Sequence, residues 1–380
     1  MTAPMTATRW DRVVGQDQAV AHLQHAATRP VHSYLLVGPR GSGVEEAARC
    51  FAASLVARAE GGGTDDPDAD RAWGLVLRGE HPDVVEIDPS TTQIVKDDAD
   101  RFVRECHASP VEGERKVVML LGAERLNDVA ANRLLKTIEE PPARTHLVLV
   151  AERAEGLLPT IRSRCQRVDF AYLPEAAVLA AVGERTHAER GALVARLAGG
   201  RVDRARNLAG PLGGVRDATL LAASKLDGNG ASVANGAATI DLAVKRALEE
   251  VELQQTEALA ALEAELEAAG YPSRVAQSRR RLVSERHKRE LRRARTDAWI
   301  EAITALETWL RDAIAGSDAP RLNIDREPAS VHARAAVEAL DACRKARNDL
   351  VEFNANESLT MERLLLRMPL DHSGARGVPT

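Results

Sequence analysis

Short runs of apolar residues alternate with stretches of helical periodicity over about the first 170 residues of the chain. Four of these runs are rich in Val, Leu and Ile, and they cover residues 33–37, 84–87, 116–121 and 146–150. Nearly continuous apolar runs of this length, separated by helices, are typical of a parallel sheet that is covered on both faces. The pattern therefore predicts an α/β domain built on a parallel sheet.

The rest of the chain has a helical pattern. Residues 174–209 contain short helical segments, and beyond about residue 215 the helical periodicity is interrupted only at 227–238, where Gly, Asn and Ala predict a loop. Aromatic residues make up only 3% of the chain, so the core depends on Leu, Val, Ile and Ala. We therefore expect a small helical domain followed by a larger helical C-terminal domain.

Charge is separated along the C-terminal half. Residues 241–267 contain eight acidic and two basic residues, whereas residues 274–295 contain ten Arg or Lys and two Glu. The sequence Gly-Tyr-Pro at 270–272 is a turn signal between the two segments. The pattern predicts an antiparallel hairpin of two helices with opposite charge.

Two interpretations of this hairpin differ in function. In the simpler one, the two helices neutralise each other and their remaining charges face solvent. In the other, basic residues of the second helix contact DNA phosphates, and the candidates are Arg279, Arg280, Arg281, Arg292 and Arg293. The net charge of −5 gives no global basic signature, so any contact with nucleic acid has to be local.

The chain has four isolated cysteines and no Cys-x-x-Cys pair, which argues against a disulfide framework or a zinc knuckle. Buried, reduced thiols are the expected state of Cys50, Cys106, Cys165 and Cys343. No stretch of 18 apolar residues occurs, and residues 1–10 contain no apolar signal segment. We expect a cytoplasmic protein without a membrane span.

A glycine-rich turn follows the first predicted strand and leads into a predicted helix. It reads GPRGSGVE over residues 38–45, which is the G-x-x-x-x-G frame of a phosphate-binding loop. Lys and Ser or Thr should follow, to reach the phosphates and hold Mg²⁺, but Val44 and Glu45 stand there. Glu45 and Glu46 place carboxylates where a triphosphate would approach. We expect a degenerate loop that binds no nucleotide, formed by Gly38, Gly41, Gly43, Val44 and Glu45.

Five segments match, in order, the motifs of one protein family. They are WDRVVGQ at 10–16, HSYLLVGP at 32–39, GEHPD at 79–83, NRLLKTIEEPP at 132–142 and LPTIRSRCQ at 158–166. Over about residues 8–210 the chain resembles the clamp-loader subunits of bacterial DNA polymerase III, which are AAA+ proteins of δ′ and γ/τ type.

The resemblance implies three domains and a tail. An AAA+ RecA-like α/β domain of P-loop type is expected at 8–172, a small helical lid domain at 173–212, and an all-α collar domain for oligomerisation at 213–370. The collar domain would include the charged helical hairpin at 241–295. Residues 371–380 are expected to be disordered.

Several residues that the ATPases of the family use for hydrolysis are replaced in this chain. The paired acids that end the third strand in its ATPases are replaced by Leu121 and Gly122, and Glu124 lies two positions further on. The resemblance aligns Asp203 with an arginine of the second sensor motif, although Arg204 is adjacent. Together with the missing lysine and hydroxyl, these losses favour a δ′-type subunit without intrinsic ATPase activity over a hydrolysing γ/τ type.

The zinc module of many family members is also missing. Of its four cysteines only Cys50 is present, and the other places hold Trp73, Asp70 and Pro67. A single carboxylate does not rebuild a tetrahedral thiolate site, so we expect no metal.

The Ser-Arg-Cys motif at Ser163, Arg164 and Cys165 is retained. In the family this arginine reaches the γ-phosphate of ATP held by the neighbouring subunit. A planar guanidinium there neutralises charge on the transferred phosphoryl group. The other interpretation is a surface arginine at the end of a helix. The resemblance favours Arg164 as an arginine finger acting in trans and Cys165 as a packing residue.

The implied function is that of a non-hydrolysing subunit in a hetero-oligomeric clamp loader of the DNA polymerase III holoenzyme. Its partners would be γ/τ and δ subunits, the sliding clamp and primer–template DNA, with no membrane and no cofactor of its own. Residues 299–312 and 350–356 resemble the collar, and the Leu364, Leu365 and Leu366 run would lie on its last helix. Two alternatives stay open: an active γ/τ-type ATPase, and a loader-like scaffold in DNA repair.

Overall fold

The computed structural model of the chain describes residues 9–58, 67–89, 93–183, 187–268, 273–315, 319–352 and 355–369. The chain divides into two compact units. The first consists of Met1–Ala181 with Gly199–Asp203, and the second consists of Val182–Ala198 with Arg204–Thr380. The predicted disordered tail lies outside the described residues, and the predicted division into three domains stays a prediction.

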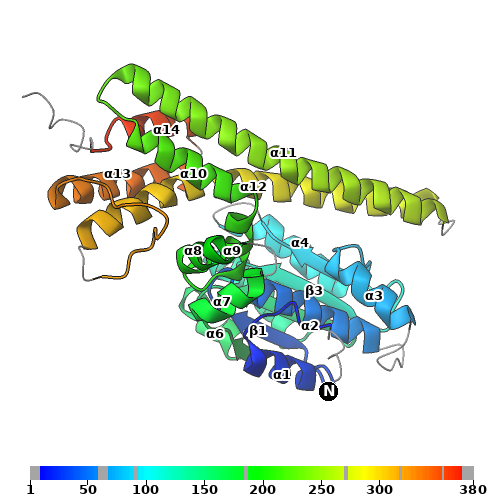
Figure 1. Cartoon of the computed structure of the whole chain (residues 1–380). Helices are drawn as coiled ribbons and strands as arrows, with labels where there is room; N and C mark the ends of the chain where they lie inside the picture. The colour runs from blue at the N-terminus through cyan, green and yellow to red at the C-terminus, as the bar shows by residue number, and fades with distance from the viewer. Residues whose placement is uncertain are drawn as a thin grey trace, which may run out of the picture. The chain divides into compact units, whose positions relative to one another are not determined.

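The first unit is built on a parallel sheet of five strands in the order β2-β3-β4-β1-β5 (Figure 1). The strands are β1 (Ser33–Val37), β2 (Val84–Ile87), β3 (Lys116–Leu121), β4 (Thr145–Ala151) and β5 (Gln166–Asp169). The parallel sheet confirms the predicted α/β fold class, and four of its strands lie where the apolar runs predicted them.

Helices cover both faces of this sheet, as alternate side chains of β1 illustrate. Tyr34 and Leu36 belong to one hydrophobic cluster, and Leu35 and Val37 belong to another on the opposite face. The helices are α1 (Asp17–Ala26), α2 (Val44–Arg58), α3 (Pro67–Leu77), α4 (Lys96–His107), α5 (Asp128–Glu139), α6 (Pro159–Arg162) and α7 (Glu175–Val182), with short 3₁₀ turns η1 (Ala123–Arg125) and η2 (Ala154–Gly156). Strands buried on both faces explain why their sequences are apolar throughout.

The motif Gly-Glu-His-Pro-Asp has a clear local role in this unit. The carboxylate of Asp83, which is fully buried, accepts hydrogen bonds from the backbone amides of Val111 (2.5 Å), Glu112 (2.9 Å) and Gly113 (2.7 Å). It therefore fixes the loop that leads into β3.

The second unit is helical, which confirms the predicted helical C-terminal part. Its helices are α8 (Ala188–Ala198), α9 (Val202–Ala209), α10 (Pro211–Ser224), α11 (Gly230–Ala268), α12 (Ser273–Ala315), α13 (Ala333–Glu352) and α14 (Glu357–Leu365). Trp299, Ile303, Leu306 and Leu310 lie along one face of α12 at helical spacing and are buried in the main core of this unit. On the last helix Leu364 and Leu365 are buried, whereas Leu366 is exposed.

The loop predicted at 227–238 is wrong from residue 230 onward, because α11 begins at Gly230 and only 227–229 lie outside the helices. Val233, Ala237 and Ile240 are buried one turn apart against α10 and α14. A side chain on Gly236 would come within 3.3 Å of Leu365, so the small residues that suggested a loop allow close helix packing here.

The long helices α11 and α12 run side by side as the predicted hairpin (Figure 1). Their far halves share a small apolar cluster of Leu259, Leu262, Leu266, Ala276 and Val283. Across the two helices, Arg280 pairs with both carboxylate oxygens of Glu263 at 2.7 and 2.6 Å. The turn predicted at 270–272 lies outside the described residues.

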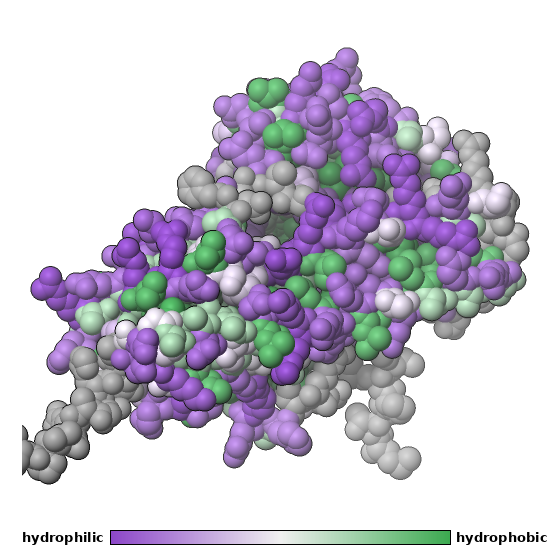
Figure 2. Space-filling view, turned by 90° about the horizontal axis from the view of Figure 1, so that it is seen from above, coloured by the Kyte–Doolittle hydropathy of each residue, from purple (hydrophilic) through white to green (hydrophobic). Residues whose placement is uncertain are grey.

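Hydrophilic residues cover most of the face drawn in Figure 2, and apolar residues appear there in small groups. Among the described residues, no helix has the length and apolar character needed to span a membrane.

Candidate functional site: the glycine-rich loop and the Ser-Arg-Cys arginine

The glycine-rich turn connects β1 to α2, as a phosphate-binding loop does. Gly41 and Gly43 have φ of 78° and 92°, values that glycine adopts without strain. Gly38 is packed so tightly that a side chain there would approach Phe170 Cβ to 2.5 Å. The frame of the loop is therefore intact, and its glycines are required by backbone geometry and packing.

Gln16, in the motif Val-Val-Gly-Gln, fixes this loop from outside. Its side-chain amide donates to the carbonyl oxygens of Ser42 at 3.0 Å and Ala171 at 2.7 Å. The buried amide thus joins the loop to the segment that follows β5.

Protein side chains occupy the positions at which the family implies a cation and a metal ligand. Val44 is only 3% exposed and belongs to the hydrophobic core. Glu45 lies 3.8 Å from Arg49, which in turn pairs with both oxygens of Glu86 on β2 at 2.8 Å. Attraction by Glu86 outweighs burial and raises the pKa of Arg49. The charge of Arg49, on the second turn of α2, is therefore bound by carboxylates of the chain itself.

A further carboxylate lies against the loop. A methyl group on Gly41 would collide with the side-chain oxygen of Asp203, and the backbone amide of Val202 donates to Gly41 O at 2.9 Å. Asp203 also pairs with Arg201 at 2.9 Å. A phosphate approaching Gly41 would meet this carboxylate, which is ion-paired with Arg201.

The neighbouring Arg204 is engaged elsewhere. Its guanidinium pairs with both oxygens of the buried Glu301 on α12, at 3.0 and 2.9 Å, and donates to Leu197 O at 2.6 Å. Arg204 therefore does not restore the cation that is missing at position 203.

An arginine that the sequence did not reveal covers the end of β3. Arg125 donates to the carbonyl oxygens of Pro89 (2.9 Å), Leu121 (3.2 Å) and Gly122 (3.3 Å). Its guanidinium lies so close to Gly122 that any side chain there would collide with it. A guanidinium thus lies at the strand end where the ATPases of the family carry paired acids. No local pattern signals this, because Pro89 is 36 residues away in the chain.

Two of the positions that correspond to the zinc module of the family are engaged elsewhere, and the expected absence of zinc stays a prediction. Cys50 is fully buried, and Asp70 forms an ion pair with Arg9. Among the described residues, no group of three or more His, Cys, Asp or Glu could hold a metal ion. Glu124, the acid near the end of β3, accepts a hydrogen bond from the backbone amide of Glu152 at 3.0 Å.

Arg164 follows α6 on the surface of the first unit, with a side chain that is 39% exposed. Its Nη1 donates to Thr160 O at 3.1 Å, and its Nη2 lies 2.7 Å from Glu139 Oε1. Ser163 donates its hydroxyl to the same carbonyl at 3.1 Å. Cys165 packs against the hydrophobic cluster of α4 and α5, and burial raises its pKa to about 12.

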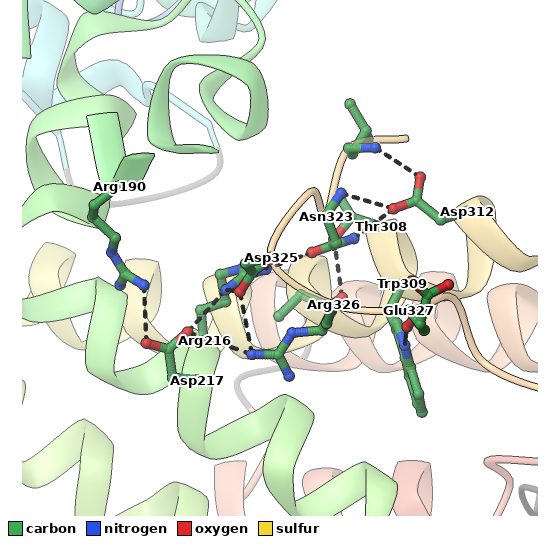
Figure 3. Close-up of polar contacts among 12 residues, drawn as sticks. Arg190, Arg216, Asp217, Thr308, Trp309, Asp312, Asn323, Asp325, Arg326 and Glu327 are labelled. Carbon is green, nitrogen blue, oxygen red and sulfur yellow. Dashed lines mark hydrogen bonds and ion pairs between the residues drawn. The ribbon is translucent and has the colours of Figure 1, made fainter. Parts of the chain in front are cut away.

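A second polar cluster lies in the second unit (Figure 3). The guanidinium of Arg216, 1% exposed, binds both oxygens of Asp325 at 3.0 and 2.7 Å and Asn323 Oδ1 at 2.7 Å. Asp312 accepts from the backbone amides of Leu322 and Asn323 at 2.9 and 2.8 Å. These contacts tie the loop before α13 to α10 and α12, which is a structural role.

Comparison with known proteins relates the first unit to subunits of DNA polymerase III. Residues 15–174 match the family model described as DNA polymerase III, delta subunit. The δ′ subunits of Pseudomonas aeruginosa and Bacillus subtilis are 38% and 33% identical over 144 and 147 residues, which are 37% and 39% of this chain and 42% and 44% of those proteins. The τ subunit of Bacillus subtilis is 33% identical over 186 residues, 48% of this chain and 32% of that protein.

The chain thus spans less than half the length of these curated relatives. Among solved structures, a DNA polymerase III gamma-subunit-related protein of Thermotoga maritima aligns with 91% of this chain and 97% of that one, at 20% identity and a TM-score of 0.47.

The parallel sheet and the glycine-rich turn into α2 define an AAA+ fold of P-loop type. Residues 15–174 match the family of DNA polymerase III delta-type subunits, and the predicted resemblance to δ′ is confirmed.

Proposed function

We propose that this chain is a non-hydrolysing δ′-type subunit of a bacterial clamp loader, and that Arg164 acts in trans on ATP bound by a neighbouring subunit. One observation carries the proposal. At the chain's own phosphate loop, Val44 is buried in the core and the carboxylate of Asp203 lies against Gly41. Arg164, in contrast, is partly exposed. This arrangement supports a chain that does not hydrolyse ATP itself but retains a cation for another site.

The assembly that we propose is a hetero-oligomer with γ/τ and δ subunits, which loads the sliding clamp on primer–template DNA. The family of residues 15–174 and the relatives named δ′ support it. In such an assembly the neighbouring subunit binds ATP, so this chain would require no nucleotide of its own. It would also require no zinc.

The test is the DNA- and clamp-stimulated ATPase of the loader reconstituted with this chain. R164A should lower the rate several-fold with assembly intact, because fingers of this kind contribute about 10³–10⁵ in rate at a single site in other NTPases. R167A is a matched control, since Arg167 is also exposed and is also bound to a carboxylate, that of Asp169 at 2.7 Å. Equal rates for R164A and wild type would reject the finger, and failure to assemble would favour the scaffold.

The second candidate is an active γ/τ-type ATPase, because relatives named τ or γ/τ are 33% and 35% identical to this chain over 186 and 167 residues. It predicts ATP hydrolysis by the isolated chain that Glu45 or Gly43 variants abolish. Our proposal predicts no hydrolysis above a buffer control.

A further inference from the structure

Within the part of the chain that the structure describes, Arg164 makes its contacts through its two terminal nitrogens. Nη1 donates to Thr160 O at 3.1 Å and lies 3.5 Å from Ser163 Oγ, and Nη2 lies 2.7 Å from Glu139 Oε1. A guanidinium has five N–H donors, so two remain after the bonds to Thr160, Ser163 and Glu139, namely Nε–H and one N–H of Nη2. The rest of the planar group is thus left for an external anion.

Glu139 comes from a different element, 25 positions earlier in the chain, and its place is fixed by how α5 ends. It is the last residue of α5, and its successor Glu140 has φ −127° and ψ 66°. Pro141 follows, and the residue before a proline is disfavoured in helical conformation. The carboxylate is therefore carried by a rigid helix end that packs against α6.

We infer that Glu139 is a positioning residue for Arg164. It holds Nη2 of the guanidinium so that the remaining donors face a phosphoryl group of the neighbouring subunit. This inference rests on the proposed function, because it assigns a partner to the same arginine.

The ion pair itself contributes little to stability, because the side chains of Arg164 and Glu139 are 39% and 44% exposed and solvent screens them. Its effect is on orientation. A long side chain that is already immobilised loses less freedom when the transition state forms. Charge on the transferred phosphoryl group is neutralised mainly in the transition state, so the loss should appear in kcat more than in KM.

The test uses the reconstituted loader and its DNA- and clamp-stimulated ATPase. We expect E139A to lower kcat about three- to tenfold, with little change in KM for ATP. E139Q keeps an oxygen that accepts the hydrogen bond, so its loss should be smaller. E140A alters the adjacent exposed glutamate and is the matched control.

A double-mutant cycle separates positioning from a structural role. If Glu139 acts through Arg164, E139A has no further effect in the R164A background. An equal loss in that background, an unchanged rate in both E139A and E139Q, or a faster rate in either overturns the inference while the finger stands. If R164A itself leaves the rate unchanged, the proposed function fails and the inference fails with it.

Discussion

The carboxylate of Asp203 lies directly against the backbone of Gly41, in the loop where a phosphate would bind in an ATPase of this fold. The contact is reinforced by the hydrogen bond from Val202 N to Gly41 O at 2.9 Å. An aspartate of the chain thus stands where the family resemblance places an arginine that would face nucleotide.

Because Gly41 and Asp203 are in contact, substitutions at the two positions should have coupled effects on the free energy of unfolding. G41A costs about 1–2 kcal/mol from its positive φ and more from collision with Asp203. In a D203A background the collision is removed, so G41A should cost less, with a coupling energy of about 0.5–3 kcal/mol. Chemical denaturation of wild type, G41A, D203A and the double variant measures the free energies of unfolding for this double-mutant cycle.

G43A is the matched control for that experiment. Gly43 also has positive φ, but the nearest atom to a new side chain is Val13 Cγ1 at 3.6 Å. The loss of stability caused by G43A should be the same with and without D203A. Additive effects of G41A and D203A would contradict the contact.

The ion pair between the buried Arg216 and Asp325, whose side chain is 28% exposed, predicts a pH dependence of stability. Burial opposes ionisation of Asp325, but the hydrogen bonds and charge of Arg216, together with Arg326, outweigh it and hold the pKa of Asp325 below its ordinary value. The stabilisation is therefore complete above the unfolded pKa of about 3.9 and is lost as pH falls through the lower folded pKa.

D325N should therefore cost about 1–3 kcal/mol at pH 7, and the difference from wild type should shrink below about pH 4. Thermal unfolding across pH 3–7 measures it. E327Q is the control, because that side chain is 88% exposed. A difference that stays constant down to pH 3 would reject the ion pair as the cause.

The thiols should be unreactive in the folded protein. Burial raises the pKa of Cys50, Cys106, Cys165 and Cys343 to about 12, so almost none is thiolate at pH 8. Ellman's reagent should react slowly with the native chain and rapidly in denaturant. Cys165, which is only partly buried, should react first, and C165S should remove that phase. Fast native reaction of several thiols would contradict the burial.

Charge reversal decides between the two interpretations of the hairpin. Arg279 is buried and Arg280 is bound to Glu263, which leaves Arg281 and Arg292 as the exposed candidates, whereas Arg293 is half-buried. We expect R281E/R292E to leave the affinity of the loader for primer–template DNA unchanged, as a solvated hairpin requires. A slope of log K against log salt that is reduced by roughly 1.8 would instead assign two phosphate contacts to them.

The sequence predicted those parts of the fold that local pattern determines. The apolar runs of β1 and β3 are continuous because both faces are covered, and they were recognised. The edge strand β5 was missed, since it is four residues long and only Val168 is buried. The helix start at Gly230 was missed because small residues resemble a loop until their packing against α10 and α14 is known.

Sequence patterns likewise indicated only some of the residues of the candidate site. Motif spacing indicated the degenerate loop and Arg164, because both lie within continuous segments. The partners of these groups, Asp203 at Gly41, Arg125 at Gly122 and Glu139 at Arg164, were not predicted as such. The first and last of these contacts join residues that are distant in the chain. Arg125 is held by the nearby carbonyls of Leu121 and Gly122 and also by Pro89 O, which is 36 residues away.

The strand order has a consequence for synthesis on the ribosome. β1 lies between β4 and β5, both of which follow it by more than a hundred residues. At roughly 5–20 residues per second, its apolar segment stays without a strand partner for on the order of 5–20 s after translation. A nascent chain that ends before residue 166 lacks one neighbour of β1, so the first unit completes its sheet only when translation is well into the chain.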